Sequence, residues 1–311
     1  MNEHNKNSNN EIKRHALGKQ IAIGSSSEGN AYFIEINRRG YQKPFRLLIE
    51  CGFNLGIISS RLMKHGISAN TIDAILVTHE HNDHSKGVNE MIGKLSKHVY
   101  APKSVFVKYG LLDSHYAHVI TYPQKKVIAD GIEVTPIPLV HKNDDGSEVE
   151  NYGYIIDIDA DYGNYKILFI TDTHYLKYNL SKYQFNTIYI EANNRSYAIV
   201  KALENAKEKG DMGKTIHYDR VLHSHMLVEN TAHTLVGSKN NQGFDLSKTD
   251  TIYLIHLSTS NQSASEQIKY YIINALKEAN LMRKWVIKKE NPQKEIELPR
   301  VKVILKNGEI Q

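Results

Sequence analysis

The amino-acid sequence predicts an α/β protein in which strands and helices form separate layers. Short runs rich in Ile, Val, Phe and Tyr, bounded by Gly, Pro, Asn or Ser, dominate the first half of the chain, as is typical of strands. A second series of such runs follows in the second half, and each series is accompanied by segments with helical apolar spacing. Two sets of strands, each followed by helices, favour a layered α/β sandwich over a regular βαβ repeat.

The first half of the chain is expected to contribute strands and two helices. The strands are predicted at residues 19–24, 31–36, 45–50, 72–78 and 99–101. Apolar spacing predicts one helix over residues 57–65, with Gly66 as its stop signal, and another over residues 88–96.

The second half is expected to repeat this arrangement. Strands are predicted at residues 132–140, 152–158, 165–171, 187–191 and 251–256. Helices are predicted at residues 197–207, 228–237 and 263–278. Two further strands, at residues 285–288 and 301–306, are expected to close a sheet edge.

Composition favours one large domain in a reducing compartment. The chain has 311 residues, and we predict a flexible polar tail over residues 1–16 followed by a single domain over residues 17–311. Export and membrane insertion are disfavoured, because the tail has no apolar signal core and no apolar run approaches the ~18 residues that span a bilayer. Cys51 is the single cysteine, so the chain can form neither an intrachain disulfide nor a cysteine zinc cluster. We therefore expect a cytoplasmic protein.

The net charge of +5 permits contact with a polyanion without demonstrating it. Residues 277–294 are locally basic, with five lysines and one arginine around Trp285. This segment could form a nucleic-acid surface. On its own it is more simply explained as the solvated face of a helix end and a strand.

The stretch "ILVTHEHNDHSKG", residues 75–87, concentrates metal-binding side chains directly after an apolar run. Residues two apart in an extended turn share a face, so His79 and His81 can point into one cavity. Asp83 and His84 follow the turn and can reach a neighbouring point. This arrangement suits two metals better than one. Neutral imidazole and carboxylate are good ligands for zinc and acceptable ligands for manganese or iron.

Further ligands are available at the ends of other predicted strands. His141, Asp172 and His256 each follow an apolar run. The carboxyl ends of strands in open α/β sheets tend to gather ligand sites. Each residue alone is equally well explained as a capping or core polar group. Together with the side chains at residues 79–84, they provide enough ligands for two metals.

The segment "HEHNDH" resembles the HxHxDH signature of the metallo-β-lactamase superfamily, and His141, Asp172 and His256 occur in that superfamily's order. The resemblance implies a four-layer αββα sandwich with a dinuclear centre at one edge. It also implies a ligand set for two divalent cations, zinc or manganese: His79, His81 and His141 for the first, Asp83, His84 and His256 for the second, and Asp172 bridging both.

A narrower similarity, to the YycJ/WalJ-type group, extends over about residues 19–273. It rests on "GSSSEGNAYFIE", "LLIECG", "YIEANN", "SHMLVENTAHTL" and "HLSTSNQSASE". Members of that group are identified as metal-dependent nucleases, usually DNA exonucleases. Glu50 stands where the superfamily has Asp, in a position that supports the metal loop from outside the ligand set. His225 matches a histidine in the pattern of that group, whereas the residues on either side of it differ from the pattern.

These observations lead to the hypothesis of a dinuclear metal-dependent hydrolase that cleaves phosphodiesters, as a DNA exonuclease does, by a metal-bridging hydroxide. Asp83, Asp172 and His225 are the expected catalytic residues. His225 would contact the phosphate or protonate the leaving group, unless it is a structural residue that caps the following helix. DNA is favoured over RNA as partner, and a homodimer is left open.

Two alternatives remain. One is a phosphodiesterase of the same fold that acts on cyclic nucleotides or other small molecules. The other is a non-catalytic nucleic-acid-binding module on a metallohydrolase scaffold, against which the complete ligand set argues.

Overall fold

A computed structural model describes residues 15–143, 145–237, 242–258, 263–290 and 298–311, with the backbone alone for residues 280–290. Of the tail predicted over residues 1–16, only His15 and Ala16 are among the described residues. The basic side chains predicted within residues 277–294 lie outside the described part, apart from Lys277.

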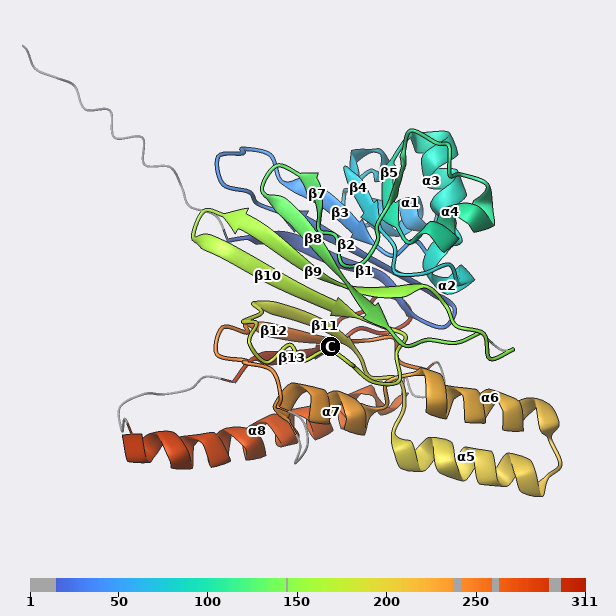
Figure 1. Ribbon diagram of the computed structural model, residues 1–311, viewed down its shortest axis with the longest axis vertical. Coiled ribbons are helices and arrows are strands. Elements are labelled where there is room, and N and C mark those ends of the chain that lie inside the picture. Colours follow the sequence, from blue (N-terminus) through green and yellow to red (C-terminus); the bar gives the residue numbers. More distant parts are fainter. Residues whose placement is uncertain (1–14, 144, 238–241, 259–262, 291–297) are drawn as a thin grey trace, which may run out of the picture.

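The strands form two sheets that pack face to face (Figure 1). The first sheet contains, in spatial order, β1 (Leu17–Ser26), β2 (Gly29–Ile36), β3 (Phe45–Ile49), β4 (Ala74–Leu76), β5 (His98–Ala101) and β6 (Ala117–Val119). Its first three strands are antiparallel, and the strands from β3 to β6 run parallel.

The second sheet begins at one edge with β7 (Lys126–Ala129) and ends at the other with β13 (Arg300–Val303). Between them lie β8 (Ile132–Leu139), β9 (Asn151–Ala160), β10 (Gly163–Ile170), β11 (Thr187–Glu191) and β12 (Thr251–Ile255). β7 to β10 are antiparallel, whereas β10 to β13 are parallel.

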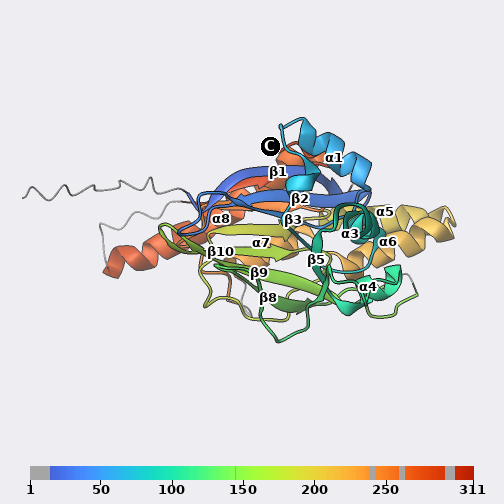
Figure 2. The same ribbon diagram turned by 90° about the horizontal axis from the view of Figure 1, so that it is seen from above.

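Helices cover the outer face of each sheet (Figures 1 and 2). The first sheet carries α1 (Leu55–Met63), α2 (Asn82–Ser85), α3 (Val88–Leu95) and α4 (Lys103–Tyr109). The second carries α7 (Val228–Val236) and α8 (Ser265–Glu290). The pair α5 (Ser196–Glu208) and α6 (Met212–Ser224) extends beyond the edge of the sheets, on the side where α4 lies. The predicted αββα sandwich is therefore confirmed.

Successive side chains along a strand point to opposite faces of its sheet, and this alternation explains the layering. In β2, Ile34 faces the other sheet and packs with Tyr154 and Phe169, whereas its neighbour Phe33 packs against the outer helices. Both faces of each sheet are thus apolar, which is why the strands read as nearly continuous hydrophobic runs. Each buried side chain of this size contributes ~1.5–3 kcal/mol relative to an exposed one.

One predicted strand is wrong. Residues 285–288 belong to α8, which continues to Glu290. The apolar run around Trp285 has strand-like composition, but no Gly or Pro interrupts the chain between Ser265 and Pro292. The helix therefore continues to Glu290, two positions before Pro292. The strand predicted at residues 301–306 is confirmed over part of its length, as the edge strand β13.

Among the residues that the structure describes, no helix has both the length and the apolar character needed to cross a bilayer.

Candidate metal centre

The residues predicted to bind metal come together where strands from both sheets end. The cluster at residues 79–84 follows β4, His141 follows β8, Asp172 follows β10, and His256 follows β12. Parallel strands present their carboxyl ends at the same edge of a sheet, so β10 and β12 of the second sheet deliver Asp172 and His256 to one place. The loop after β4 of the first sheet meets them there, because Asp83 lies within contact distance of His256 and His84 within contact distance of Asp172.

Three strands near the centre, β3, β10 and β12, are followed by residues in a strained backbone conformation. Glu50, Asp172 and His256 have φ values of 65°, 50° and 54°, in the left-handed region that side chains other than glycine rarely adopt. Such a conformation costs on the order of 1 kcal/mol or more and persists only when the surroundings enforce it. It turns the three side chains toward the centre directly after the strand.

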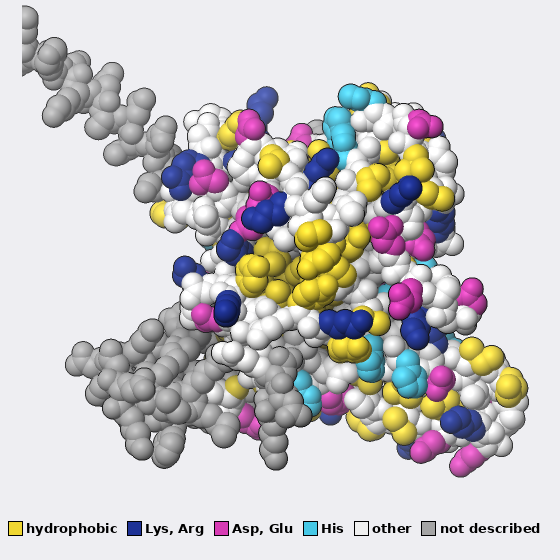
Figure 3. Space-filling model, viewed as in Figure 1, with side chains coloured by type: hydrophobic (Ala, Val, Ile, Leu, Met, Phe, Trp, Pro, Cys, Tyr) yellow, Lys and Arg dark blue, Asp and Glu magenta, His cyan; other side chains and the backbone are white. Residues whose placement is uncertain are grey.

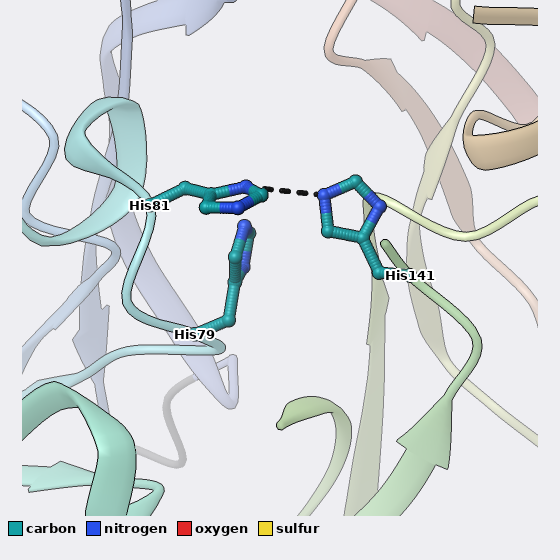
Figure 4. Close-up of side chains that lie close together, drawn as sticks. All are labelled: His79, His81 and His141. Atoms are coloured by element: carbon teal, nitrogen blue, oxygen red, sulfur yellow. Dashed lines mark hydrogen bonds between the residues drawn. The ribbon is translucent and has the colours of Figure 1, made fainter. Parts of the chain in front are cut away.

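His79, His81 and His141 face one another around a common point (Figure 4). Their ring centroids lie 4.7–5.1 Å apart. The distance from His141 Nε2 to His81 Nδ1 is 3.1 Å. These ligand atoms lie as close together as the ligands of one cation do, so the three histidines could hold a single metal.

The second nitrogen of each ring has a partner that fixes the ring's orientation. His79 Nδ1 lies 2.9 Å from the Thr78 hydroxyl, and His81 Nε2 lies 2.8 Å from Asn143 Oδ1. His141 Nδ1 lies 3.3 Å from the carbonyl oxygen of Ser224. Partners of this kind are typical of metal-binding histidines.

A second group is formed by Asp83, His84 and His256, with Asp172 beside it. Asp83 Oδ2 lies 3.2 Å from His84 Nε2 and 3.3 Å from His256 Nε2. Asp172 Oδ2 lies 2.6 Å from His84 Nε2 and 3.9 Å from His79 Nε2. Asp172 thus stands between the two groups, where a bridging carboxylate would be required.

Glu50 supports the loop at residues 79–84 through its contacts with Thr78 and His84. Its buried carboxylate accepts hydrogen bonds from the Thr78 hydroxyl at 2.6 Å and from the Thr78 amide at 3.2 Å. The same carboxylate lies 3.2 Å from His84 Nδ1. Glu50 therefore holds both the start of the loop and one ring of the second group, as expected for a residue that supports ligands.

Glu191 is a site residue that sequence reasoning missed. Its fully buried carboxylate lies 2.7 Å from His225 Nδ1 and 3.3 Å from His256 Nδ1, and it accepts the backbone amides of Thr173 and Met226. The sequence did carry a signal for it. Glu191 is the last residue of a predicted apolar strand, and Asp172 directly follows another such strand. Glu191, His225, His256 and Asp172 are also close enough to hold an ion. However, the 2.7 Å contact is a hydrogen bond that already engages His225 Nδ1.

The histidines of the centre fall into two classes, those whose pKa is lowered and those whose pKa is raised. Burial lowers the pKa of His79 well below its usual range and lowers the pKa of His141 to about 4, so both are neutral and ready to coordinate. Burial also opposes charge on His84 and His256. The carboxylates of Asp83, Asp172 and Glu50 together outweigh burial and raise the pKa of His84 well above its usual range. Asp172, Asp83 and Glu191 together raise the pKa of His256 to about 10. These two rings must therefore release a proton when they coordinate a metal.

The carboxylates of the centre are held in the charged form. Burial alone would raise the pKa of Asp172, but His256 and His84 lower it well below its usual range. His84 lowers the pKa of Asp83 in the same way against the effect of burial. Both aspartates thus offer charged oxygens, the form that a divalent cation binds.

The donor set fits divalent metal ions. Among the described residues, His79 Nε2 and both carboxylate oxygens of Asp172 are fully buried and make no hydrogen bond of good geometry. Leaving such groups unsatisfied costs ~1–3 kcal/mol each, and more when they are charged. A cation coordinated by nitrogen and oxygen ligands would satisfy all three, and zinc and manganese both accept such ligands.

A cavity of about 920 Å³ opens over the centre. Its floor includes His81, Asp83, His141, Asp172, His225 and His256. Its walls carry Lys103 and Lys108 from α4 and Arg220 from α6. These cations were not predicted, because neither helix was expected from the sequence.

Comparison with known proteins identifies the family. The model of the beta-lactamase superfamily domain matches residues 45–238. The exodeoxyribonuclease WalJ of Streptococcus pneumoniae is 26% identical over 271 residues, which covers 85% of this chain and 90% of that protein. The exodeoxyribonuclease YycJ of Bacillus anthracis is 27% identical over 159 residues, or 50% of this chain and 54% of that protein.

Among solved structures, that of unliganded yeast PDE1 superposes with a TM-score of 0.57 at 11% identity, covering 93% of this chain and 98% of that one. This similarity supports the fold alone. The family match, the curated relatives and the histidine–aspartate centre at the sheet edge lead to one conclusion: the chain belongs to the β-lactamase superfamily and is a metal-dependent hydrolase of the YycJ/WalJ type.

Proposed function

We propose that this protein is a dinuclear metal-dependent phosphodiesterase that acts on nucleic acid, with DNA as the preferred substrate. The observation that carries the proposal is the pair of donor groups that share Asp172. His79, His81 and His141 would hold one cation, and Asp83, His84 and His256 the other. The relatives named as exodeoxyribonucleases support the choice of substrate.

The chemistry supplied by two bound divalent cations is neutralisation of phosphate charge and activation of a water molecule as a nucleophile at neutral pH. The chain's own contribution is positional. Asp172, held by its left-handed backbone and surrounded by histidines, orients the attacking water. The cavity walls bring Arg220 and Lys108 toward the phosphate.

His225 is suited to protonate the departing oxygen. Its Nδ1 is engaged by Glu191 at 2.7 Å and by Asp172 at 3.0 Å, which leaves Nε2 for a ligand in the cavity that His225 lines. The alternative, a structural residue that caps the following helix, is disfavoured because the His225 ring contacts the carboxylates of Asp172 and Glu191 and neighbouring histidine rings.

Replacing His225 by glutamine is expected to slow DNA hydrolysis by about 100-fold, the lower range for loss of a general acid. Hydrolysis of bis(p-nitrophenyl) phosphate should fall far less, because p-nitrophenolate departs without a proton. Steady-state rates on both substrates test this, with the exposed α6 residue in His217→Gln as control. Equal losses on both substrates would assign His225 to positioning and not to proton transfer.

Replacing Glu50 by glutamine removes the charge that supports Thr78 and His84. We expect metal affinity and activity to fall ~10–100-fold, as is usual when a partner of a metal ligand is lost. Titration of the metal-free variant with Zn²⁺ measures the affinity, and Glu133→Gln, a substitution of a half-exposed carboxylate paired with Lys125, is the matched control. Unchanged affinity would show that Glu50 serves the fold alone.

The substrate is tested by incubating Mn²⁺- and Zn²⁺-loaded protein with end-labelled single- and double-stranded DNA, RNA and cyclic nucleotides. Degradation of DNA that is absent in the Asp83→Ala variant is the expected result. Hydrolysis of cyclic nucleotides alone would identify a small-molecule phosphodiesterase. Nucleic-acid binding without metal or hydrolysis would identify a binding module. A cytoplasmic location and a single domain over residues 17–311 remain predictions.

A further inference from the structure

We propose that a second cavity, beside the metal centre, is a subsite for the adjoining nucleotides of a single-stranded nucleic acid. The inference rests on the proposed phosphodiesterase function. It adds that recognition extends beyond the scissile phosphate, so that the enzyme selects polynucleotide chains over isolated phosphodiesters.

The second cavity lies between α6 and the segment that joins β8 to β9. It measures about 340 Å³, near the lower end for sites that hold small ligands. In Figure 1 this segment extends above α6, and in Figure 2 it lies beside α4 and α6. Asn143 and Arg220 line both cavities. The two hollows are therefore neighbours, and a chain bound at the centre would pass Asn143 and Arg220 to reach the second.

Both walls of the second cavity are tied to ligands of the metal centre. The Ser224 carbonyl oxygen, in the last residue of α6, lies 3.3 Å from His141 Nδ1. On the other wall, Asn143 Oδ1 lies 2.8 Å from His81 Nε2. These contacts fix the position of the second cavity relative to the reacting phosphate, as a subsite requires.

The α6 wall is a single helix face. Thr215, Ile216, Asp219, Arg220 and His223 line the cavity, and their spacing repeats every three to four residues. This face combines a cation, a hydroxyl, a flat aromatic ring and an apolar side chain. Proteins that hold single strands combine such groups, with cations on the backbone phosphates and flat or apolar groups against the bases.

Charge in the second cavity favours an anionic ligand. Lys142 and Arg220 stand on opposite walls, and Asp219 is the one carboxylate among the described lining residues. Asp219 Oδ2 lies 3.8 Å from His223 Nδ1, and both side chains are exposed. The lining therefore carries a positive balance that suits a phosphodiester backbone.

Cations also lie on the far side of the centre. Lys103 and Lys108 of α4 line the first cavity opposite Arg220, and Lys108 Nζ is oriented by the Asn82 side chain at 2.7 Å. In Figure 3, basic, histidine and acidic side chains lie together on this side of the molecule, between the upper helices and the α5–α6 pair. A polynucleotide that crosses the centre meets cations on both sides, whereas a cyclic nucleotide would use the centre alone.

The experiment uses the metal-loaded full chain and two variants on opposite walls, Lys142→Gln and His223→Ala. Both side chains are exposed, so neither substitution threatens the fold. Exposed α5 and α6 residues that line neither cavity provide matched controls, as Lys201→Gln and His217→Ala. Substrates are single-stranded thymidine oligonucleotides of two to ten residues and bis(p-nitrophenyl) phosphate.

For the wild-type chain, kcat/KM should rise with oligonucleotide length. Each cavity variant should lower kcat/KM on the decamer about 10-fold, within the range for loss of one base or phosphate contact, and leave bis(p-nitrophenyl) phosphate hydrolysis unchanged. Lys142→Gln should also reduce the slope of log affinity against log salt by about 0.7, the contribution of one phosphate on a single strand.

The outcomes separate the two proposals. Hydrolysis of both substrates by the wild type, with no selective effect of either variant on the decamer, would overturn the subsite and leave the phosphodiesterase intact. Hydrolysis of neither substrate by the wild type would overturn the proposed function, and the subsite with it.

Discussion

Hydrolysis of phosphodiesters is expected to be lost when Asp172 is replaced by asparagine. The carboxylate stands 2.6 Å from His84 Nε2 and 3.9 Å from His79 Nε2, between the two groups proposed to hold metal. Asparagine keeps the size of the side chain and removes its charge, so two cations would repel each other without a bridging anion. The loss should exceed ~100-fold, the largest effect usual for a residue that only supports a ligand.

The measurement is kcat/KM on single-stranded DNA, with metal content determined on the same preparation. Asp159→Asn is the control, because this carboxylate is half-exposed and pairs with Arg39 at 3.1 Å, away from the centre. If Asp172→Asn keeps two metals and near wild-type activity, Asp172 does not bridge the cations.

Removal of metal is expected to abolish activity and to lower thermal stability. The centre buries charged and unsatisfied donors, among them His79 Nε2 and both oxygens of Asp172. A cation that binds the folded state alone at 100 times its Kd stabilises it by about 2.7 kcal/mol. For a chain of 311 residues that corresponds to a shift in Tm of about 4 °C.

Calorimetry of the protein with chelator, and again after addition of Zn²⁺ or Mn²⁺, measures the shift. Activity should return in parallel with Tm. A chelated protein that keeps both its Tm and its activity would show that the donor cluster serves as a polar core without metal.

The residues that the structure brings together could be named from the sequence because their signal is local. An apolar run followed at once by histidine or aspartate marks the end of a buried strand, and the residues at 79–84, 141, 172 and 256 all follow this rule. Glu191 follows it as well and was missed, because a single glutamate at a strand end has no spacing partner nearby. Its role depends on His225, which another element brings to it.

The parts that were not predicted depend on tertiary packing. β6 and β7 are short edge strands, and their few residues show no clear alternation in the sequence. α6 has a mixed polar sequence and is stabilised where Val221 packs with Ile199 and Leu227. Lys108 and Arg220 consequently had no predicted place near the centre. The left-handed conformations of Glu50 and His256 likewise follow from the surrounding contacts and not from residue type.

Binding of two cations by the two donor groups is the central proposal for this enzyme. Its most direct test is the metal content of the wild-type chain and of the Asp83→Ala/His84→Ala double variant, measured by mass spectrometry after exhaustive dialysis, alongside DNase activity. We predict about two metals per wild-type chain, and about one metal with no activity in a double variant that remains folded. A double variant that retains both the wild-type metal content and the wild-type activity would contradict the claim.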